Sequence, residues 1–350
     1  MTRIALLAHD TFSESDEAKT ARGLLRYGHY DVRAVLDRSC AGRRVSDVHP
    51  GGPDVPIVAG MDEVEAEVDA LVVGVASVGG QFDERWRPDV RTALKRGCTV
   101  VAGLHDFLAE DEELAALAEA HDGDFWDVRR PPDGLSVGRG IADQVDATVV
   151  LTVGTDCAVG KKTTALELTE AARARGDSAA FVPTGQTGVL IAGWGTVVDA
   201  VPGDFVAGAV EQMILEAGDD PDWLFVEGQG TIVHPGYSAV SCGLLHGAMP
   251  DALVLCHVAG RETLHGYDAF ALPPLREYVH LHEALARPVH PTRVAAGALN
   301  TSRLDADAEA RRAIDRYASA LDRPAADPLR FGADPLLDAL TDTVSADADH

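Results

Sequence analysis

One stretch near the middle of the chain limits the fold more than any other. An apolar, β-branched run at 147–153 leads into a glycine loop at 154–160 and then into good helix formers. Glycines let the backbone approach an anion closely, and the N–H groups of the loop and of the helix N-terminus then point at it. The sequence therefore predicts an α/β fold in which a phosphate-binding loop is formed by Gly154, Thr155, Asp156, Cys157, Ala158, Val159, Gly160, Lys161, Lys162, Thr163 and Thr164.

The loop departs from the usual pattern in two ways. Five residues rather than four separate Gly154 from Gly160, and Lys162 stands where Ser or Thr normally follows the lysine. The usual hydroxyl binds magnesium, whereas a charged lysine has no lone pair with which to ligate a cation. We hypothesise that Lys162 supplies the positive charge of the missing metal. Thr163 would reach a metal only if the helix began one residue late.

The composition makes the two adjacent lysines more informative. The chain has 30 Lys and Arg against 56 Asp and Glu, a formal net charge of −26, and two of its only four lysines are Lys161 and Lys162. An ordinary βα turn does not explain that pair. The acidic, lysine-poor composition is typical of a halophilic protein. Its charge opposes binding to nucleic acid or to an anionic membrane, so we expect neither as a partner.

Length and cysteine content bound the class of protein. At 350 residues, two domains are expected. No apolar run reaches the roughly 18 residues of a membrane span, and the N-terminal apolar stretch is too short for a signal peptide. The five cysteines are odd in number and lack paired metal-ligand spacing. We expect a cytoplasmic homo-oligomer with reduced thiols that acts on a small molecule.

The first half of the chain alternates between short apolar runs and helical patterns, which predicts a parallel sheet covered by helices. We expect a weak helix at 64–68 and place the domain boundary in the Pro-, Gly- and Arg-rich segment 125–140. The turn after the first strand has no glycine, so the dinucleotide fingerprint is absent. The predicted strands are 3–8, 30–36, 70–76 and 99–103, and the other helices are 16–27, 85–96 and 108–120.

Two strand ends in this half carry candidate substrate-binding residues. Asp37 and Arg38 follow the second predicted strand, and Gly79 and Gly80 follow the strand at 70–76. Ligands of open α/β sheets bind beyond the carboxyl ends of the strands. The alternative interpretation is that both segments are ordinary βα turns.

The second half repeats the alternation after the glycine loop. Gly176 is expected to end the loop's helix, and Asp204 to cap a helix at 206–216. Glu227 and Asn300 each lie at the end of a predicted strand. The predicted strands are 179–182, 223–226, 253–258 and 293–299.

Several residues of this half are candidates for chemistry, each with an alternative. Glu227 is either a general base or a carboxylate that holds magnesium or bonds the loop. His234 and His246 are alternative bases, although a lone histidine is more often structural. Arg261 either binds a substrate carboxylate or forms a surface ion pair. Cys157 lies near two lysines and a helix N-terminus, which depress a thiol pKa, so it is either an acyl carrier or a small residue that fits the loop.

The motifs carry a resemblance to known families. The segment 154–161 resembles the lengthened P-loop of dethiobiotin synthetase, and 224–230 is similar to that enzyme's acidic strand-end motif. A closer resemblance is to a family of P-loop proteins long listed as of unknown function. Its hallmarks stand here at 154–164, 226–230, 234–235 with 237–238, 244–247 and 298–301.

The resemblance implies a Rossmann-like domain at 1–140 followed by a P-loop NTPase-like α/β domain at 141–350. Members of the closer family act as D-glutamate N-acetyltransferases that use acetyl-CoA, which implies an acidic amino acid as acceptor and a P-loop that holds cofactor phosphates. In related P-loop folds an asparagine placed like Asn300 contacts adenine; the alternative is a turn residue. The other functions left open are an ATP- and magnesium-dependent ligase or kinase, with Thr163 and Glu227 at the metal, and a nucleotide-binding protein without turnover.

Overall fold

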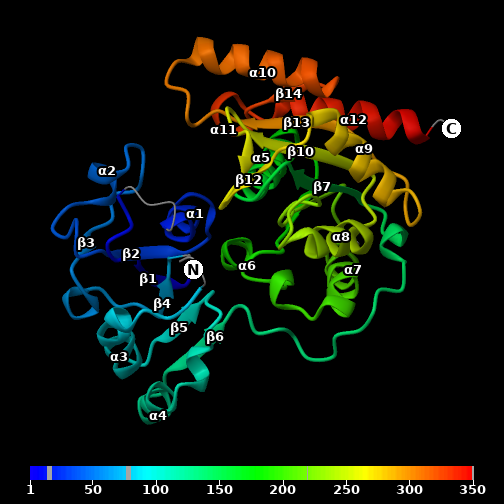
Figure 1. Ribbon diagram of the computed structural model, residues 1–350. Helices are drawn as coiled ribbons and strands as arrows, with labels where there is room; N and C mark the ends of the chain where they lie inside the picture. The colour runs from blue at the N-terminus through cyan, green and yellow to red at the C-terminus, as the bar shows by residue number, and fades with distance from the viewer. Residues whose placement is uncertain (14–17, 76–79, 219, 349–350) are drawn as a thin grey trace. The chain divides into compact units, whose positions relative to one another are not determined.

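The computed structural model describes residues 1–13, 18–75, 80–218 and 220–348. These residues form two units: Met1–Pro131 together with Val189–Val197, and the remainder of the chain. Each unit contains one parallel six-stranded sheet (Figure 1), so the predicted α/β class is confirmed.

The sheet of the first unit has the strand order β3-β2-β1-β4-β5-β6. Residues Ile4–Leu7 of the central strand β1 are fully buried, as expected for a parallel sheet that is covered on both faces. The chain order reverses between β1 and β4, which is where open α/β sheets bind ligands. The strands are β1 Arg3–Leu7, β2 Asp31–Leu36, β3 Ile57–Val58, β4 Ala70–Val73, β5 Thr99–Ala102 and β6 Asp124–Asp127.

Four helices and several 3₁₀ turns accompany this sheet. Helix α3 packs against β4 and β5 and also contacts α4 (Figure 1). The second segment of this unit, Val189–Val197, is bonded to the first: the carbonyl of Leu190 accepts a hydrogen bond from the Tyr30 hydroxyl at 2.9 Å. The helices are α1 Lys19–Tyr27, α2 Val45–Val48, α3 Arg87–Lys95 and α4 Glu112–Ala120.

The sheet of the second unit has the order β14-β13-β10-β7-β9-β8. The strand β7, which precedes the glycine loop, lies between β10 and β9, so the loop leaves from the middle of the sheet. A separate antiparallel hairpin, β11–β12, follows β10. The strands are β7 Thr148–Gly154, β8 Ala179–Val182, β9 Trp223–Val226, β10 Ala252–Val258, β11 Thr263–Leu264, β12 Tyr267–Ala271, β13 Arg293–Asn300 and β14 Ala325–Ala326.

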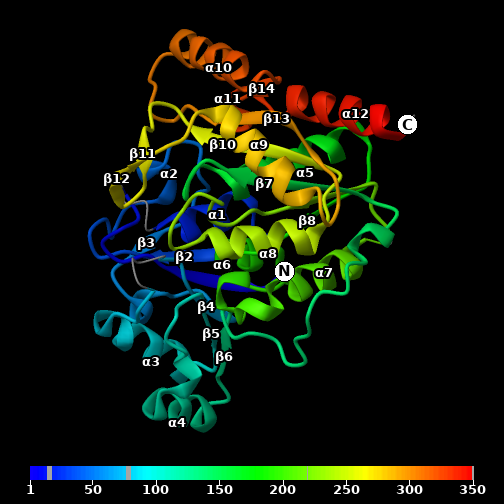
Figure 2. The same ribbon diagram turned by 45° about the vertical axis from the view of Figure 1, so that its right-hand side comes forward.

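The helices of this unit cover its sheet. Helix α5 packs against β7, β8 and β9 and contacts α11 and α12, while α7 and α8 lie side by side (Figures 1 and 2). Helix α6 joins the two units in sequence, because its last residues belong to the first unit. The helices are α5 Lys161–Arg175, α6 Gln186–Ala192, α7 Val206–Ala217, α8 Ser238–Ala248, α9 Leu275–Ala286, α10 Asp307–Leu321, α11 Pro328–Phe331 and α12 Asp334–Ala348.

Two expectations about local structure were wrong, and one strand was missed. The segment 64–68 is not helical; a 3₁₀ turn at Met61–Glu63 precedes it, and Val64 is buried in the core. The short strand β6, which overlaps the start of the segment 125–140, was not predicted. Asp204 does not cap α7, because it lies inside the 3₁₀ turn Gly203–Phe205 and Phe205 takes the cap position.

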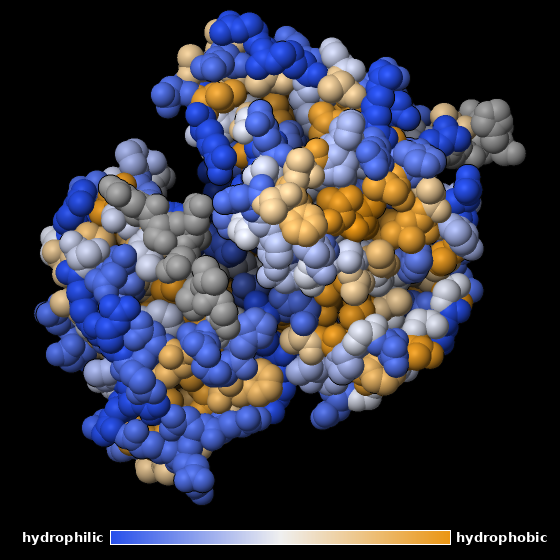
Figure 3. Space-filling view, viewed as in Figure 1, coloured by the Kyte–Doolittle hydropathy of each residue, from blue (hydrophilic) through white to orange (hydrophobic). Residues whose placement is uncertain are grey.

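On the face shown in Figure 3, hydrophilic residues are interspersed with patches of apolar ones. None of the helices built from the described residues combines the length and the apolar character needed to cross a membrane.

Close backbone packing at the end of β9 produces a testable requirement for glycine. A Cβ atom at Gly228 would lie 1.7 Å from the carbonyl oxygen of Thr152 in β7, which no side-chain rotation can relieve. We expect Gly228→Ala to lower the free energy of unfolding by about 3 kcal/mol or more, at the upper end of overpacking costs. Urea unfolding measures the change. Gly203→Ala is the matched control, because a Cβ there meets nothing within 4 Å; equal stabilities of the two variants would contradict the prediction.

Candidate functional site

The glycine loop joins β7 to α5 with backbone angles that only certain residues adopt. Gly160 caps the helix with φ of +102°, and Gly176 ends it with φ of +99°, as predicted for Gly176. The helix begins at Lys161 itself. Lys162 therefore directly follows the loop lysine in the first turn, and the condition that would bring Thr163 to a metal is not met.

The predicted loop residues separate into an inner and an outer set. Those that the protein buries are Gly154, Thr155, Asp156, Val159, Lys161 and Thr164. Those that remain exposed or half-buried are Cys157, Ala158, Gly160, Lys162 and Thr163. A Cβ built on Gly160 would meet nothing within 4 Å, so the space over the loop is open there. The outer set can contact a ligand, while the inner set supports the loop.

Asp156 is the centre of this support. Its side chain is fully buried, and its Oδ1 accepts the Cys157 N–H at 2.6 Å. Its Oδ2 accepts from Nη1 of Arg261 at 2.9 Å and from the His265 N–H at 2.7 Å. Asp156 thus fastens the segment after β10 to the glycine loop.

Arg261 helps to hold the glycine loop in place. Besides Asp156, its Nη1 donates to the carbonyl of Cys157 at 2.7 Å, and its side chain is 9 % exposed. The alternative interpretation of Arg261, an ion pair, is therefore the one observed, although the pair is buried rather than at the surface. The guanidinium already has its carboxylate partner within the protein, which leaves the proposed contact with a substrate carboxylate without support from the geometry.

Lys161 points back toward the protein rather than into the open space. Its Nζ donates to the carbonyls of Asp156 and Gly230, both at 2.8 Å. Burial lowers the pKa of Lys161, and the nearby thiol and carboxyl groups act in the opposite direction. Two of the three donors of the ammonium group are thus used by carbonyl oxygens, and one remains for a ligand.

Glu227 lies at the end of β9 in a cradle of backbone donors. Its Oε2 accepts the N–H groups of Thr184 at 3.1 Å and of Gly185 at 3.0 Å. A Cβ at Gly188 would lie 2.1 Å from this oxygen, so glycine is needed there. Burial raises the pKa of Glu227, although Lys162 and the two N–H groups oppose the shift.

The hydrogen bonds of His234 fix which ring nitrogen carries the proton. Its Nδ1 accepts the Gly236 N–H at 3.0 Å, so the neutral ring carries its proton on Nε2. This Nε2 is buried and has no partner among the described residues. Burial also lowers the pKa of His234, which favours the neutral form. His246, the other candidate, uses Nε2 to bond the carbonyl of Leu285 at 2.9 Å and so joins α8 to α9.

One group of potential metal ligands includes His234. A ring nitrogen of His234, Sγ of Cys157 and a carboxylate oxygen of Asp156 lie within 4.8 Å of one another. Both oxygens of Asp156 already accept hydrogen bonds, and the Arg261 guanidinium lies 2.9 Å from one of them. A positive neighbour and a ring nitrogen that carries a proton both oppose a cation. The geometry therefore does not support a metal site here.

Asn300 lies in a local turn at the end of β13. Its Oδ1 accepts the Ser302 N–H at 2.9 Å, which is the turn interpretation that the sequence left open. This bond uses one of the two lone pairs of Oδ1. It supports the turn interpretation without deciding whether the amide group also contacts a ligand.

The first unit contains a cavity of about 600 Å³ at its candidate ligand-binding edge. It lies where β1 and β4 end, at the reversal of strand order. The lining residues include His9, Asp10, Asp83, Arg85 and Trp86. Gly79, a predicted substrate-binding residue, is outside the described residues, and Gly80 has φ of +62° and no room for a Cβ beside His105.

Asp37 is buried beside this edge and holds the loop after β1. Its carboxylate accepts hydrogen bonds from the N–H groups of Asp10, Phe12 and Ser39 and from the Ser39 hydroxyl. Burial by itself would raise the pKa of Asp37, but these hydrogen bonds outweigh it and lower the pKa. Because Asp37 is fully buried, the geometry supports a structural role rather than the predicted contact with substrate.

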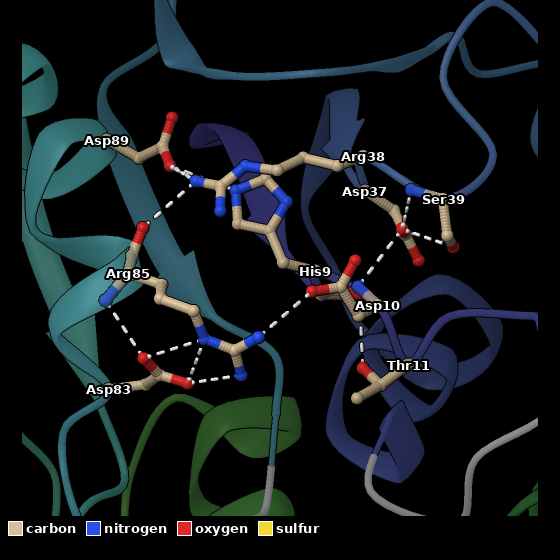
Figure 4. A network of polar contacts seen from close by, with 10 residues as sticks. His9, Asp10, Thr11, Asp37, Arg38, Ser39, Asp83, Arg85 and Asp89 are labelled. Atoms are coloured by element: carbon tan, nitrogen blue, oxygen red, sulfur yellow. Dashed lines mark hydrogen bonds and ion pairs between the residues drawn. The ribbon is translucent and has the colours of Figure 1, made fainter.

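Arg38 belongs to a polar network beside the cavity (Figure 4). Its Nη2 donates to Oδ2 of Asp89 at 3.1 Å and to the carbonyl of Arg85 at 2.9 Å. The same Asp89 oxygen lies 2.9 Å from Nε2 of His9. Arg85 forms ion pairs with Asp83 and Asp10 and remains 68 % exposed.

Most residues of this network were not predicted from the sequence. His9, Arg85 and Asp89 are far apart in the chain and belong to no motif, so only the folded sheet brings them together. The pairing of Asp156 with Arg261 was missed as well, although both residues had been named. One signal could have indicated it: Arg261 follows β10 closely, and the ends of neighbouring parallel strands meet at one edge.

Comparison with known proteins shows the family to which this chain is related. A family model described as a domain of unknown function with a P-loop, DUF1611_C, matches residues 136–337, and its Rossmann-like counterpart, DUF1611_N, matches residues 38–131. The chain belongs to the DUF1611 family. A crystal structure of a DUF1611 family protein from Anabaena variabilis is 40 % identical, with a TM-score of 0.92, and the match covers 98 % of this chain and 100 % of that one.

Two relatives of this DUF1611 protein carry a functional name. A protein from Pseudoalteromonas sp. named D-glutamate N-acetyltransferase is 36 % identical over 268 residues, which is 76 % of this chain and 80 % of the relative. A protein of the same name from Tritonibacter scottomollicae is 39 % identical over 278 residues, or 79 % and 82 % of the two chains.

The buried pair of Asp156 and Arg261 predicts a large effect on stability. Arg261→Leu leaves the Asp156 carboxylate buried without its counter-ion, so we expect the free energy of unfolding to fall by about 3–5 kcal/mol. Denaturant unfolding measures the loss, and adding Asp156→Asn should recover part of it. Arg175→Leu is the control: its partner Asp334 is exposed, and such pairs contribute about 0–1 kcal/mol. Unchanged stability of Arg261→Leu would restore Arg261 as a candidate for substrate binding.

Proposed function

We propose that the protein is an acetyl-CoA-dependent N-acetyltransferase whose acceptor is an acidic amino acid, D-glutamate. The observation that carries the proposal is the pair of relatives with this name, which align with about three quarters of the chain. The P-loop domain that the family model matches is the part suited to cofactor phosphates.

The glycine loop has the features that cofactor phosphates need. Its outer residues face open space over Gly160. The backbone N–H groups at the start of α5 form the positive end of the helix dipole, which favours an anion. Lys162 and the third donor of Lys161 add positive charge. In acetyl-CoA the phosphates do not react, so a loop that holds them without a metal is sufficient. When bound, acetyl-CoA would supply the acetyl group from its thioester: an amide bond would form at the acceptor nitrogen, the C–S bond would break, and CoA would leave as the free thiol.

The acceptor ammonium must lose a proton before its nitrogen can attack, and we assign this step to Glu227. A carboxylate is a better base when its pKa is raised toward neutral pH. Burial produces such a rise at Glu227, while the N–H groups of Thr184 and Gly185 fix its orientation. The unpartnered Nε2–H of His234 is suited to donate a hydrogen bond rather than to accept a proton.

The cavity of the first unit carries charged groups that match those of an acidic amino acid. An acidic amino acid carries two carboxylates and one ammonium group. The guanidinium of Arg85 pairs with Asp83 and Asp10, but unlike that of Arg261 it is largely exposed, so a carboxylate of the acceptor can also reach it; Arg38 lies beside it in the same network. Asp10 and Asp83 suit the ammonium group. The cavity therefore offers complementary charges for both kinds of group.

The direct test is turnover with defined acceptors. The purified protein with acetyl-CoA and D-glutamate should yield N-acetylglutamate and free CoA, detected by mass spectrometry. Glu227→Gln should lower kcat by about 10²–10⁴-fold, the usual contribution of a general base, and should remove one ionisation from the pH profile. L-glutamate and D-alanine are acceptor controls. Magnesium-dependent ATP consumption without acetyl transfer would instead support a ligase or kinase.

The position of Lys162 gives a prediction about metal. If Lys162 replaces the magnesium of ordinary P-loops, acetyl-CoA should bind with unchanged affinity in excess EDTA, and Lys162→Thr should make binding dependent on magnesium. Calorimetric titration at constant ionic strength measures both. Lys95→Thr, which removes an exposed lysine elsewhere, controls for the loss of charge. Complete loss of binding on chelation would contradict this prediction and favour an ATP-dependent activity.

A further inference from the structure

Three exposed aromatic side chains lie together in the second unit. Tyr237 precedes α8 and is 51 % exposed, and Tyr267 and Phe270 of β12 are 42 % and 48 % exposed. Among the described residues, these are the only aromatic side chains in the set of strongly exposed large hydrophobic ones. We call them the aromatic surface. Their grouping is notable because only 5 % of the chain is aromatic.

His234 joins the two halves of the aromatic surface. Its ring stacks on Tyr237 with a centroid distance of 4.5 Å, and Tyr267 meets it edge-on at 4.7 Å. Tyr267 in turn lies 6.1 Å from the ring of Phe270. The four rings are therefore continuous, with His234 buried and the other three facing solvent.

The aromatic surface lies beside the glycine loop. A ring nitrogen of His234 lies within 4.8 Å of Sγ of Cys157 in the loop. Tyr237 packs so closely on Gly230 that a Cβ there would lie 2.8 Å from its own, and the carbonyl of Gly230 accepts from Lys161. The loop carboxylate Asp156 holds the hairpin through the His265 N–H. The rings and the loop are thus fixed to one another.

Two further observations point to a ligand at this place. The Nε2–H of His234 is a buried donor with no partner in the described part of the chain, and leaving such a donor unpaired is costly. The hairpin that carries Tyr267 and Phe270 follows β10, whose carboxyl end lies at the ligand-binding edge of the sheet.

We infer that the aromatic surface stacks the adenine ring of the cofactor whose phosphates the glycine loop holds. The inference rests on the proposed function in so far as that cofactor is acetyl-CoA. Flat aromatic side chains bind nucleobases through their faces, and only a sugar separates the base of a nucleotide from its phosphate. The His234 donor meets an oxygen of the same ligand. Stacking of this kind selects for a base without reading its edge.

The test separates the two ends of the cofactor. Tyr267→Leu and Tyr237→Leu remove a ring but keep an apolar side chain, and Tyr267→Phe keeps the ring. The probes are CoA, adenosine 3′,5′-bisphosphate, which has no pantetheine arm, and 4′-phosphopantetheine, which has no base. We expect each leucine variant to bind CoA and the bisphosphate about tenfold more weakly, with 4′-phosphopantetheine unaffected and Tyr267→Phe close to the unaltered protein.

Calorimetry measures the affinities, and the ultraviolet absorbance of adenine, which decreases on stacking, gives a readout independent of activity. Leu329→Ala, at an exposed apolar residue of the same unit, is the control. Unchanged CoA affinity in the leucine variants would overturn the inference and leave the proposed function intact. Equal weakening of 4′-phosphopantetheine would place the pantetheine arm on the rings and overturn it as well.

Failure of the unaltered protein to bind CoA would contradict the proposed function instead. The same variants titrated with ATP then decide the inference, because the adenine of ATP must show the same dependence on the rings. Affinity for ATP that does not depend on the rings, or no binding of any adenine nucleotide, would overturn it.

Discussion

The candidate cofactor site depends on one buried charge, the carboxylate of Asp156. A buried carboxylate is tolerated only when it is fully paired, and here two backbone N–H groups and the Arg261 guanidinium satisfy it. Each of these partners fixes a different segment: the loop itself, the turn after β10 and the hairpin. The shape of the loop, the position of its lysine and the place of the aromatic rings therefore follow from the need to neutralise one side chain.

This constraint explains why the two lysines of the loop differ. Lys161 is drawn inward by the carbonyls of Asp156 and Gly230, so it braces the loop as well as offering charge. Lys162 remains half-exposed on the first turn of α5. In a protein with a net charge of −26, such a locally positive loop stands out electrostatically and attracts anions.

Sequence patterns predicted more of the fold than of the contacts within the candidate site. The strand, loop and helix around Gly160 and the stop at Gly176 were predicted because they depend on local rules about glycine and helix ends. Strand β6 was missed because it has four residues with an aspartate at each end. The roles of Asp37 and Arg261 depend on partners distant in sequence, and no local rule says whether a charged side chain faces a ligand or completes the protein's own hydrogen bonds. The assignments of Glu227, His234 and the cavity stay proposals for the same reason.

The division of the chain has a consequence for how the protein is made. The first unit is discontinuous: it consists of Met1–Pro131 and of Val189–Val197, which supplies the carbonyl that bonds Tyr30. During synthesis, β7 and the glycine loop emerge from the ribosome before the first unit has received its last segment. The first unit can therefore not be completed until the chain has been made as far as Val197, and a truncation anywhere between its two parts removes a segment of the first unit as well as most of the second.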